Sequence, residues 1–107
     1  MRSTNYLILA LATAVAVPAI AGGDPAAGKA KSQVCAACHG PDGNSPTGDF
    51  PKLAGQHEDY LAAALSQYKA GKRKDPIMGG MAANLSKQDM ADLAAYFASQ
   101  QGLQLKY

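Results

Sequence analysis

The chain has 107 residues, and its 10 Lys and Arg residues nearly balance its 8 Asp and Glu residues, for a net charge of +2. This length favours a single domain, and such a balance gives no reason to expect binding to nucleic acid or to an anionic membrane. The sequence has no Trp and only 2 Phe, so its apolar side chains alone would build a thin core. Small domains with thin cores commonly add a disulfide, a metal or a cofactor.

The first 21 residues are typical of an export signal. Met1 and Arg2 give a positive start, residues 6–17 are an apolar run without charge (YLILALATAVAV), and Ala19-Ile20-Ala21 supplies a small-residue cleavage site. The run is shorter than the roughly 20 apolar residues that cross a bilayer as a helix, although an uncleaved anchor remains the alternative. We therefore expect a cleaved signal peptide at 1–21 and a mature domain at 22–107 without a membrane span.

The first predicted helix begins at Asp24. Asp24 is a favourable N-cap, and Pro25 follows at the first helical position, where its missing N–H costs no hydrogen bond. We expect this helix to run to Ala36 or Ala37. The following stretch, 40–55, is dense in Gly, Pro, Asp and Asn and is predicted to be an irregular loop.

A second helix is predicted from about Glu58 to Ala70, followed by a loop. Its apolar residues recur at helical spacing on one face: Leu61, Ala64, Leu65 and Tyr68. Gly71 is suited to end it in a left-handed conformation. We expect residues 71–85, which include Met78 and Met81, to form a second loop.

The third predicted helix has the clearest start signal of the chain. Ser86 and Asp89 have the spacing of a capping box. An apolar stripe follows, made of Met90, Leu93, Ala94 and Phe97, and Gly102 is expected to end the helix. No window alternates clearly enough to be a strand, so the predicted class is all-α.

Cys35, Cys38 and His39 form a C-x-x-C-H motif, which is the pattern of covalent haem c attachment. Two thiols at this spacing can bond to the two vinyl groups of one haem, and the adjacent imidazole can ligate its iron. A thioredoxin-like pair would need a βαβ context, and a zinc site would need further ligands. A plain disulfide is allowed in an exported protein. We interpret the motif as the attachment site of one haem c.

Four residues can be considered as a second axial ligand to the iron. Met90 lies on the apolar stripe of the last helix, which favours a packing role, and His57 stands beside two acidic residues at a helix start. Met78 and Met81 lie in a Gly-rich segment far along the chain from His39. The residues alone leave the choice between these two methionines open. A thioether ligand would raise the reduction potential relative to a second imidazole.

In the order of its motifs the chain resembles the class I cytochromes c. It is most similar to the small bacterial ones and to one half of the two-haem periplasmic cytochromes. The segments that carry the resemblance are 35–46 (CAACHGPDGNSP), 50–56 (FPKLAGQ), 75–86 (DPIMGGMAANLS) and 89–100 (DMADLAAYFASQ). The chain departs from the two-haem proteins in having a single C-x-x-C-H motif.

The resemblance implies a class I cytochrome c fold of three to four helices around one covalently bound haem, with a low-spin iron held by His39 and a methionine. The family pattern places this methionine eight residues before the Ser that opens the last helix, which selects Met78. It also implies that a proline carbonyl in the loop after the motif accepts a hydrogen bond from the ligand histidine. Pro46 fits that role better than Pro41.

The same resemblance assigns packing roles near the haem. Gly28 on the first helix would face Tyr96 or Phe97 on the last, and Leu53 would rest on the haem ring. The candidates for contacting a propionate group are Lys52, Gln56 and Arg73.

The function implied is that of a periplasmic carrier of single electrons, not an enzyme. Its expected donor is a quinol-oxidising complex and its acceptor a terminal oxidase or reductase, with the carrier a monomer or weak dimer. The alternative is an enzyme or gas-binding sensor with an open haem coordination position. The main charge cluster (Lys69, Lys72, Arg73 and Lys74) is either a solvated helix end or a docking patch for an acidic partner.

Overall fold

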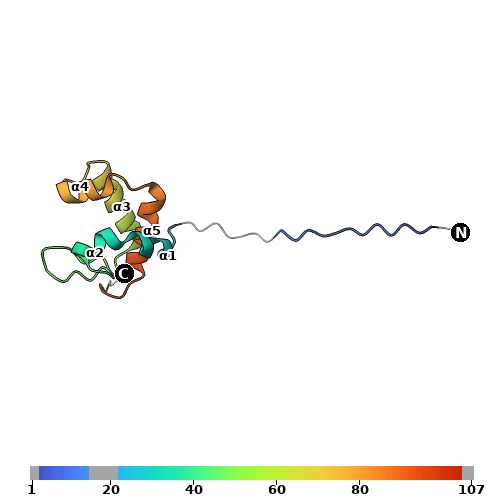
Figure 1. The fold of residues 1–107 in the computed structure, drawn as a ribbon, viewed down its shortest axis with the longest axis horizontal. Coiled ribbons are helices and arrows are strands. Elements are labelled where there is room, and N and C mark those ends of the chain that lie inside the picture. The colour runs from blue at the N-terminus through green and yellow to red at the C-terminus, as the bar shows by residue number, and fades with distance from the viewer. Residues whose placement is uncertain (1–2, 15–21, 105–107) are drawn as a thin grey trace.

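The computed structural model describes residues 3–14 and 22–104, which contain five helices and no strand. In chain order these are α1 (Pro25–Lys31), α2 (Gln33–His39), α3 (Glu58–Lys69), α4 (Pro76–Ala82) and α5 (Lys87–Ala98). The predicted all-α class is confirmed. Helices α1 and α3 pack against α5, while α2 lies against α1 and α4 lies against α3 (Figure 1).

Residues 3–14 have no regular secondary structure and extend away from the helical body (Figure 1). Their apolar side chains are exposed, Leu7 and Ile8 by more than four fifths (87% and 89%). The predicted cleavage site at 19–21 lies outside the described residues, so processing after Ala21 stays a prediction. Within the described ranges, no helix has both the length and the apolar character needed to cross a membrane.

The first predicted helix is in fact two helices, α1 and α2, separated at Ser32. The hydroxyl of Ser32 donates to the carbonyl of Lys29 at 2.8 Å, and the Ser32 N–H bonds to the same carbonyl. These bonds close a tighter turn than the α-helix allows, because a serine side chain competes with backbone partners. The expected single helix to Ala36 or Ala37 is therefore wrong. The chain bends at Ser32, and α2 continues to His39.

Helix α3 confirms the second predicted helix and its stop signal. Gly71 follows the C-cap with a φ of +74°. The N–H of Gly71 bonds to the carbonyl of Tyr68, and the N–H of Lys72 bonds to that of Gln67. This pair of bonds is the Schellman motif, which requires a left-handed residue at the position of Gly71.

Helix α4 lies within the stretch 71–85 that was predicted to be a loop. Asp75 caps it by accepting from the N–H groups of Ile77 and Met78, and Pro76 occupies the first helical position. These are the same signals that mark the start of α1. The sequence nevertheless favours a loop here, because two adjacent glycines, Gly79 and Gly80, lower the helix propensity of a short segment.

Helix α5 begins as predicted and ends earlier than predicted. Ser86 and Asp89 form a complete capping box. The helix ends at Ala98, with Ser99 as its C-cap, and not at Gly102. All four residues of the predicted apolar stripe are buried: Met90, Leu93, Ala94 and Phe97.

The core forms where α1 and α3 pack against α5. It consists of Leu61 from α3 with Leu93, Ala94, Tyr96 and Phe97 from α5. Gly28 in α1 allows the close crossing: a Cβ atom there would lie 2.7 Å from the Cβ of Tyr96. Of the two aromatic partners predicted for Gly28, Tyr96 is therefore the one in contact. Phe97 packs against Gly43 instead.

A buried carboxylate, that of Asp92, joins α1 to α5. Its oxygens accept from the N–H of Asp24 at 2.8 Å, from Nζ of Lys31 at 2.6 Å and from Nε2 of Gln88 at 2.7 Å. Lys31 also pairs with Asp89 at 2.9 Å. Because the charge is paired and its oxygens accept three hydrogen bonds, the buried carboxylate is compatible with a stable fold.

Acid is expected to destabilise the contact that Asp92 makes between α1 and α5. The pKa of Asp92 is about 2, below the ordinary 3.8, because Lys31, the Asp24 N–H and Gln88 bond to the charged form. A group whose pKa is lowered by folding stabilises the protein fully above its unfolded pKa. That stabilisation is lost as the pH falls from about 4 towards 2.

Thermal unfolding of Asp92→Asn followed by circular dichroism between pH 7 and pH 2 checks this expectation. We expect a lower Tm than wild type at neutral pH and a smaller loss of Tm in the acid window. Asp49→Asn, which alters an exposed loop residue, is the matched control. An acid response of Asp92→Asn equal to that of wild type would contradict the assignment.

Candidate functional site

Helix α2 presents all three residues of the C-x-x-C-H motif. Cys35 and Cys38 are half-buried free thiols three residues apart, and His39 is the last residue of the helix. Burial raises the pKa of the Cys35 thiol, and the neighbouring Cys38 adds to the effect. One short helix therefore carries two unpaired thiols next to an imidazole, which is the donor set that haem c attachment requires.

The imidazole of His39 is buried and held by the carbonyl of Pro51. The distance from Nδ1 to the carbonyl oxygen is 2.8 Å, and the ring of Phe50 meets the imidazole edge-on with centroids 6.4 Å apart. A carbonyl oxygen only accepts, so Nδ1 carries the proton and Nε2 keeps its lone pair for a metal. A carbonyl partner of this kind fixes the ring and strengthens it as a ligand.

The acceptor is therefore Pro51, and the prediction of Pro46 is wrong. Pro46 and Pro51 are both exposed, but Pro51 lies two residues before the point at which the loop returns to Gly43. Backbone bonds from Leu53 and Ala54 to the carbonyl of Gly43 make this return. A long-range bond that closes a loop has no signature in the sequence. The only available signal was that Pro51, like Pro46, follows the motif.

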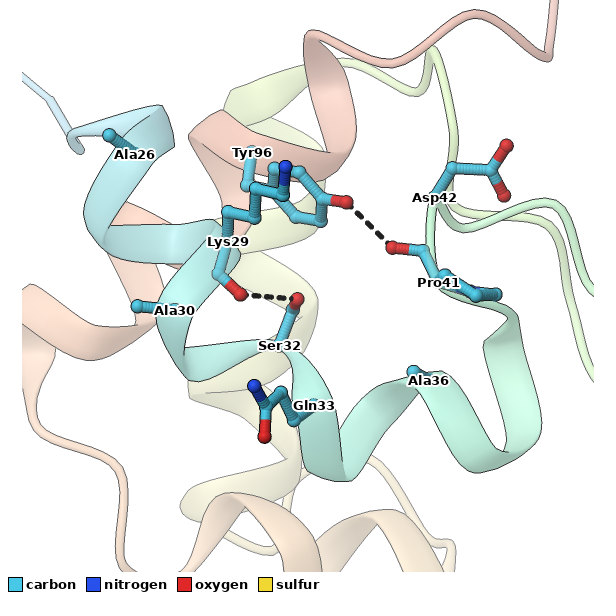
Figure 2. A pocket seen from close by; sticks show the side chains of 9 residues that line it. All are labelled: Ala26, Lys29, Ala30, Ser32, Gln33, Ala36, Pro41, Asp42 and Tyr96. Atoms are coloured by element: carbon cyan, nitrogen blue, oxygen red, sulfur yellow. Dashed lines mark hydrogen bonds between the residues drawn. The ribbon is translucent and has the colours of Figure 1, made fainter.

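Pro41, the other candidate, has a different partner. The hydroxyl of Tyr96 donates to its carbonyl oxygen at 2.6 Å. This bond lies at one side of an open groove of about 600 Å³ that is lined by α1, α2, Pro41, Asp42 and Tyr96 (Figure 2). The bond ties α5 to the chain directly after His39.

The candidate second ligands occupy different environments. Met78 is half-buried in α4, while Met81, one turn later, is 48% exposed. Met90 is buried in α5, which confirms its packing role, and His57 is exposed at the start of α3. Met78 is thus more buried than Met81, and the choice of ligand between them stays a prediction.

Several apolar side chains at the edge of the core, together with Cys35, are only half-buried. Leu53, Leu65 and Leu85 pack against the core but are only half-buried, as is Cys35. Apolar side chains that contact a core and still expose surface can bury more area against an added ring. The position of Leu53 beside the core is consistent with its predicted contact with a haem.

The basic cluster lies at the C-terminal end of α3 and before α4. Lys72 and Lys74 are exposed, and Lys69 donates to the carbonyl of Leu85. Arg73 lies over the rings of Tyr68 and Tyr60, 5.0 Å and 5.9 Å from their centroids, and donates to the Tyr60 hydroxyl. Arg73 is thus held by aromatic side chains. Lys69 is exposed like Lys72 and Lys74, so these three lysines carry the accessible charge of the cluster.

Comparison with known proteins agrees with these features. The family model described as cytochrome c matches residues 25–101. The cytochrome c4 of Pseudomonas aeruginosa is 53% identical over 98 residues, which cover 90% of this chain and 49% of that protein. The crystal structure of reduced recombinant cytochrome c4 from Pseudomonas stutzeri is similar with a TM-score of 0.72 and 52% identity, over 76% of this chain and 47% of that one.

The chain thus spans about half the length of the cytochromes c4 that it matches. A shorter relative is matched almost throughout: cytochrome c-554(548) of Halomonas halodenitrificans is 44% identical over 82 residues. This match covers 74% of the present chain and 99% of the relative.

Proposed function

The chain belongs to the cytochrome c family, and on that premise we propose that it carries single electrons between redox proteins and is not itself an enzyme. It holds one covalent haem c, with its iron, on the C-x-x-C-H motif. Bound there, the haem supplies reversible exchange of one electron between Fe(III) and Fe(II). The hydrogen bond from His39 to Pro51 is the observation that carries the proposal.

In this proposal Cys35 and Cys38 anchor the haem, and His39 is the proximal ligand. The Pro51 carbonyl holds the imidazole in one orientation and one tautomer, so that the Nε2 lone pair stays directed away from the loop. A ligand that keeps its place during the change of charge suits electron transfer better than a mobile one. Catalysis on a bound substrate would instead need an open coordination position.

We propose that the thioether of Met78 would supply the second protein ligand to the iron. The N-terminal end of α4 is held by Asp75, which accepts from the Met78 N–H itself at 3.1 Å. This cap fixes the backbone from which the thioether extends. Met81, with nearly half of its surface exposed, is assigned to the border of the haem edge.

A spectroelectrochemical titration of the purified holoprotein tests this function. We expect one reversible step that fits a single-electron equilibrium, with low-spin optical spectra in both oxidation states. A ferric high-spin spectrum, together with binding of carbon monoxide by the reduced wild-type protein, would overturn the carrier and favour an open-coordination enzyme or gas sensor.

We further propose that the carrier acts in the periplasm, exported by a signal peptide that is removed after Ala21. The motif for removal is the small-residue site at 19–21. The expected donor is a quinol-oxidising complex, and the expected acceptor is a terminal oxidase or reductase. Encounters of this kind bury little surface and are short-lived.

Charge reversal at the exposed lysines tests whether the basic cluster steers anionic partners. With ferrocyanide as reductant, Lys72→Glu and Lys74→Glu are each expected to slow reduction about threefold at low salt and to weaken its dependence on ionic strength. Stopped-flow kinetics over a range of salt concentrations measures both effects.

The matched control is Lys29→Glu, which makes the same charge change on α1. If all three variants lose rate equally, only net charge matters and the cluster is a solvated helix end.

A further inference from the structure

Residues 100–103, which follow α5, lie against the loop after the C-x-x-C-H motif. We call residues 100–103 the C-terminal strap. Its Gln101 carbonyl accepts from Nδ2 of Asn44 at 2.8 Å, and its Leu103 N–H donates to the carbonyl of Ala54 at 2.8 Å. Figure 1 shows this red end of the chain beside the green segment after α2. The strap therefore bonds to the loop at two points ten residues apart in the sequence.

The strap fits the loop closely at a glycine. A Cβ atom on Gly102 would lie 2.6 Å from the Cβ of Ala54 and 2.7 Å from Oδ1 of Asn44, closer than such atoms approach one another. Ala54 is fully buried beneath it. Gly102 was predicted to end a helix, but its position is explained by this close approach.

The loop itself is closed by bonds to Gly43. The carbonyl of Gly43 accepts from the N–H of Leu53 at 2.8 Å and from that of Ala54 at 3.2 Å. Asn44 also binds the carboxylate of Asp42 through its own N–H and side-chain amide. The two ends of the loop, at 42–44 and 53–54, are thus joined to each other, and both are bonded to the strap.

Pro51 lies just before the second of these anchored ends. Its carbonyl accepts from Nδ1 of His39, and Pro51 has no N–H with which to bond elsewhere. The position of this carbonyl therefore depends on the anchors on either side of it. These anchors are the Gly43 carbonyl and the contacts of Ala54 with the strap.

We propose that Asn44 and Gly102 are positioning residues for His39. They seat the strap on the loop, the seated loop holds the Pro51 carbonyl in line with Nδ1, and that bond sets the strength of His39 as an iron ligand. The inference rests on the proposed function, because it takes His39 as the proximal ligand. A longer bond makes the imidazole a weaker donor, which favours Fe(II) over Fe(III).

The test compares Asn44→Ala and Gly102→Ala with Gly48→Ala. Gly48 lies in the same loop, but a Cβ atom there meets nothing within 4 Å. Both strap variants are expected to shift the equilibrium constant for reduction towards Fe(II) by about threefold, a small effect because the partner of His39 is displaced and not removed. Hydrogen exchange of the His39 Nδ1 proton, followed by NMR of the reduced protein, should accelerate in parallel.

Lower thermal stability with an unchanged redox equilibrium and unchanged Nδ1 exchange would overturn the inference, since the strap would then be structural only. If Gly102→Ala fails to fold, the comparison of Asn44→Ala with Gly48→Ala decides alone. Failure of the proposed function is distinguishable, because wild-type protein would then lack a low-spin spectrum with histidine ligation before any variant is made.

Discussion

Replacing Gly28 with alanine is expected to destabilise the protein by about 3 kcal/mol, the upper end of the usual cost of overpacking. The added Cβ would lie 1.9 Å from the carbonyl oxygen of Asp92 and 2.7 Å from the Cβ of Tyr96. Both belong to α5, and neither can move without opening the α1–α5 contact. Urea unfolding at neutral pH followed by circular dichroism measures the change in the free energy of unfolding.

Gly80→Ala is the matched control for this prediction. Gly80 is exposed on α4, and a Cβ atom there meets nothing within 4 Å. Because alanine favours the helix over glycine, this variant is expected to gain up to about 1 kcal/mol. Equal stability of the two variants would show that the α1–α5 crossing is looser than the distances imply.

Replacing Met78 with alanine is expected to open the sixth coordination position. The ferric protein should become high-spin, and the reduced protein should bind carbon monoxide. The equilibrium constant for reduction should fall by at least about tenfold, because the thioether that favours Fe(II) is lost. Optical spectra in both oxidation states and a redox titration measure these effects.

Met81→Ala serves as the control because it removes the same side chain one turn later in α4. It is expected to keep the low-spin spectrum and to resist carbon monoxide, since Met81 is 48% exposed and assigned to the haem border. The reverse pattern, with Met81→Ala opening the site and Met78→Ala leaving it closed, would transfer the ligand assignment to Met81.

Features with local signals were predictable from the sequence. The starts of α3 and α5, the left-handed Gly71 and the buried stripe of α5 all follow from residues a few positions apart. Helix α4 was also within reach, because Asp75 and Pro76 repeat the signal of Asp24 and Pro25. Gly79 and Gly80 lie within this helix, and their low helix propensity favours the interpretation of the segment as a loop.

Features that depend on long-range contacts were not predictable. The choice of Pro51 over Pro46 depends on Gly43 bonding to residues ten and eleven positions later. The close fit of Gly102 depends on the contact of the strap with Ala54. In the sequence, nothing distinguishes Asp92 from the exposed polar residues of the same helix. Its burial follows only from the crossing of α1, which brings Lys31 to it. The sequence therefore predicts candidate donor residues for the site, but it does not predict the long-range hydrogen bonds that hold the surrounding chain.

Intact-mass analysis of the protein, matured in a host that attaches haem, tests the central claim most directly. The claim is that one haem is bonded through Cys35 and Cys38 beside His39. We predict a mass equal to the processed polypeptide plus one haem that persists under denaturing conditions, and loss of the adduct when both cysteines are changed to serine. A mass equal to that of the bare polypeptide would contradict the account.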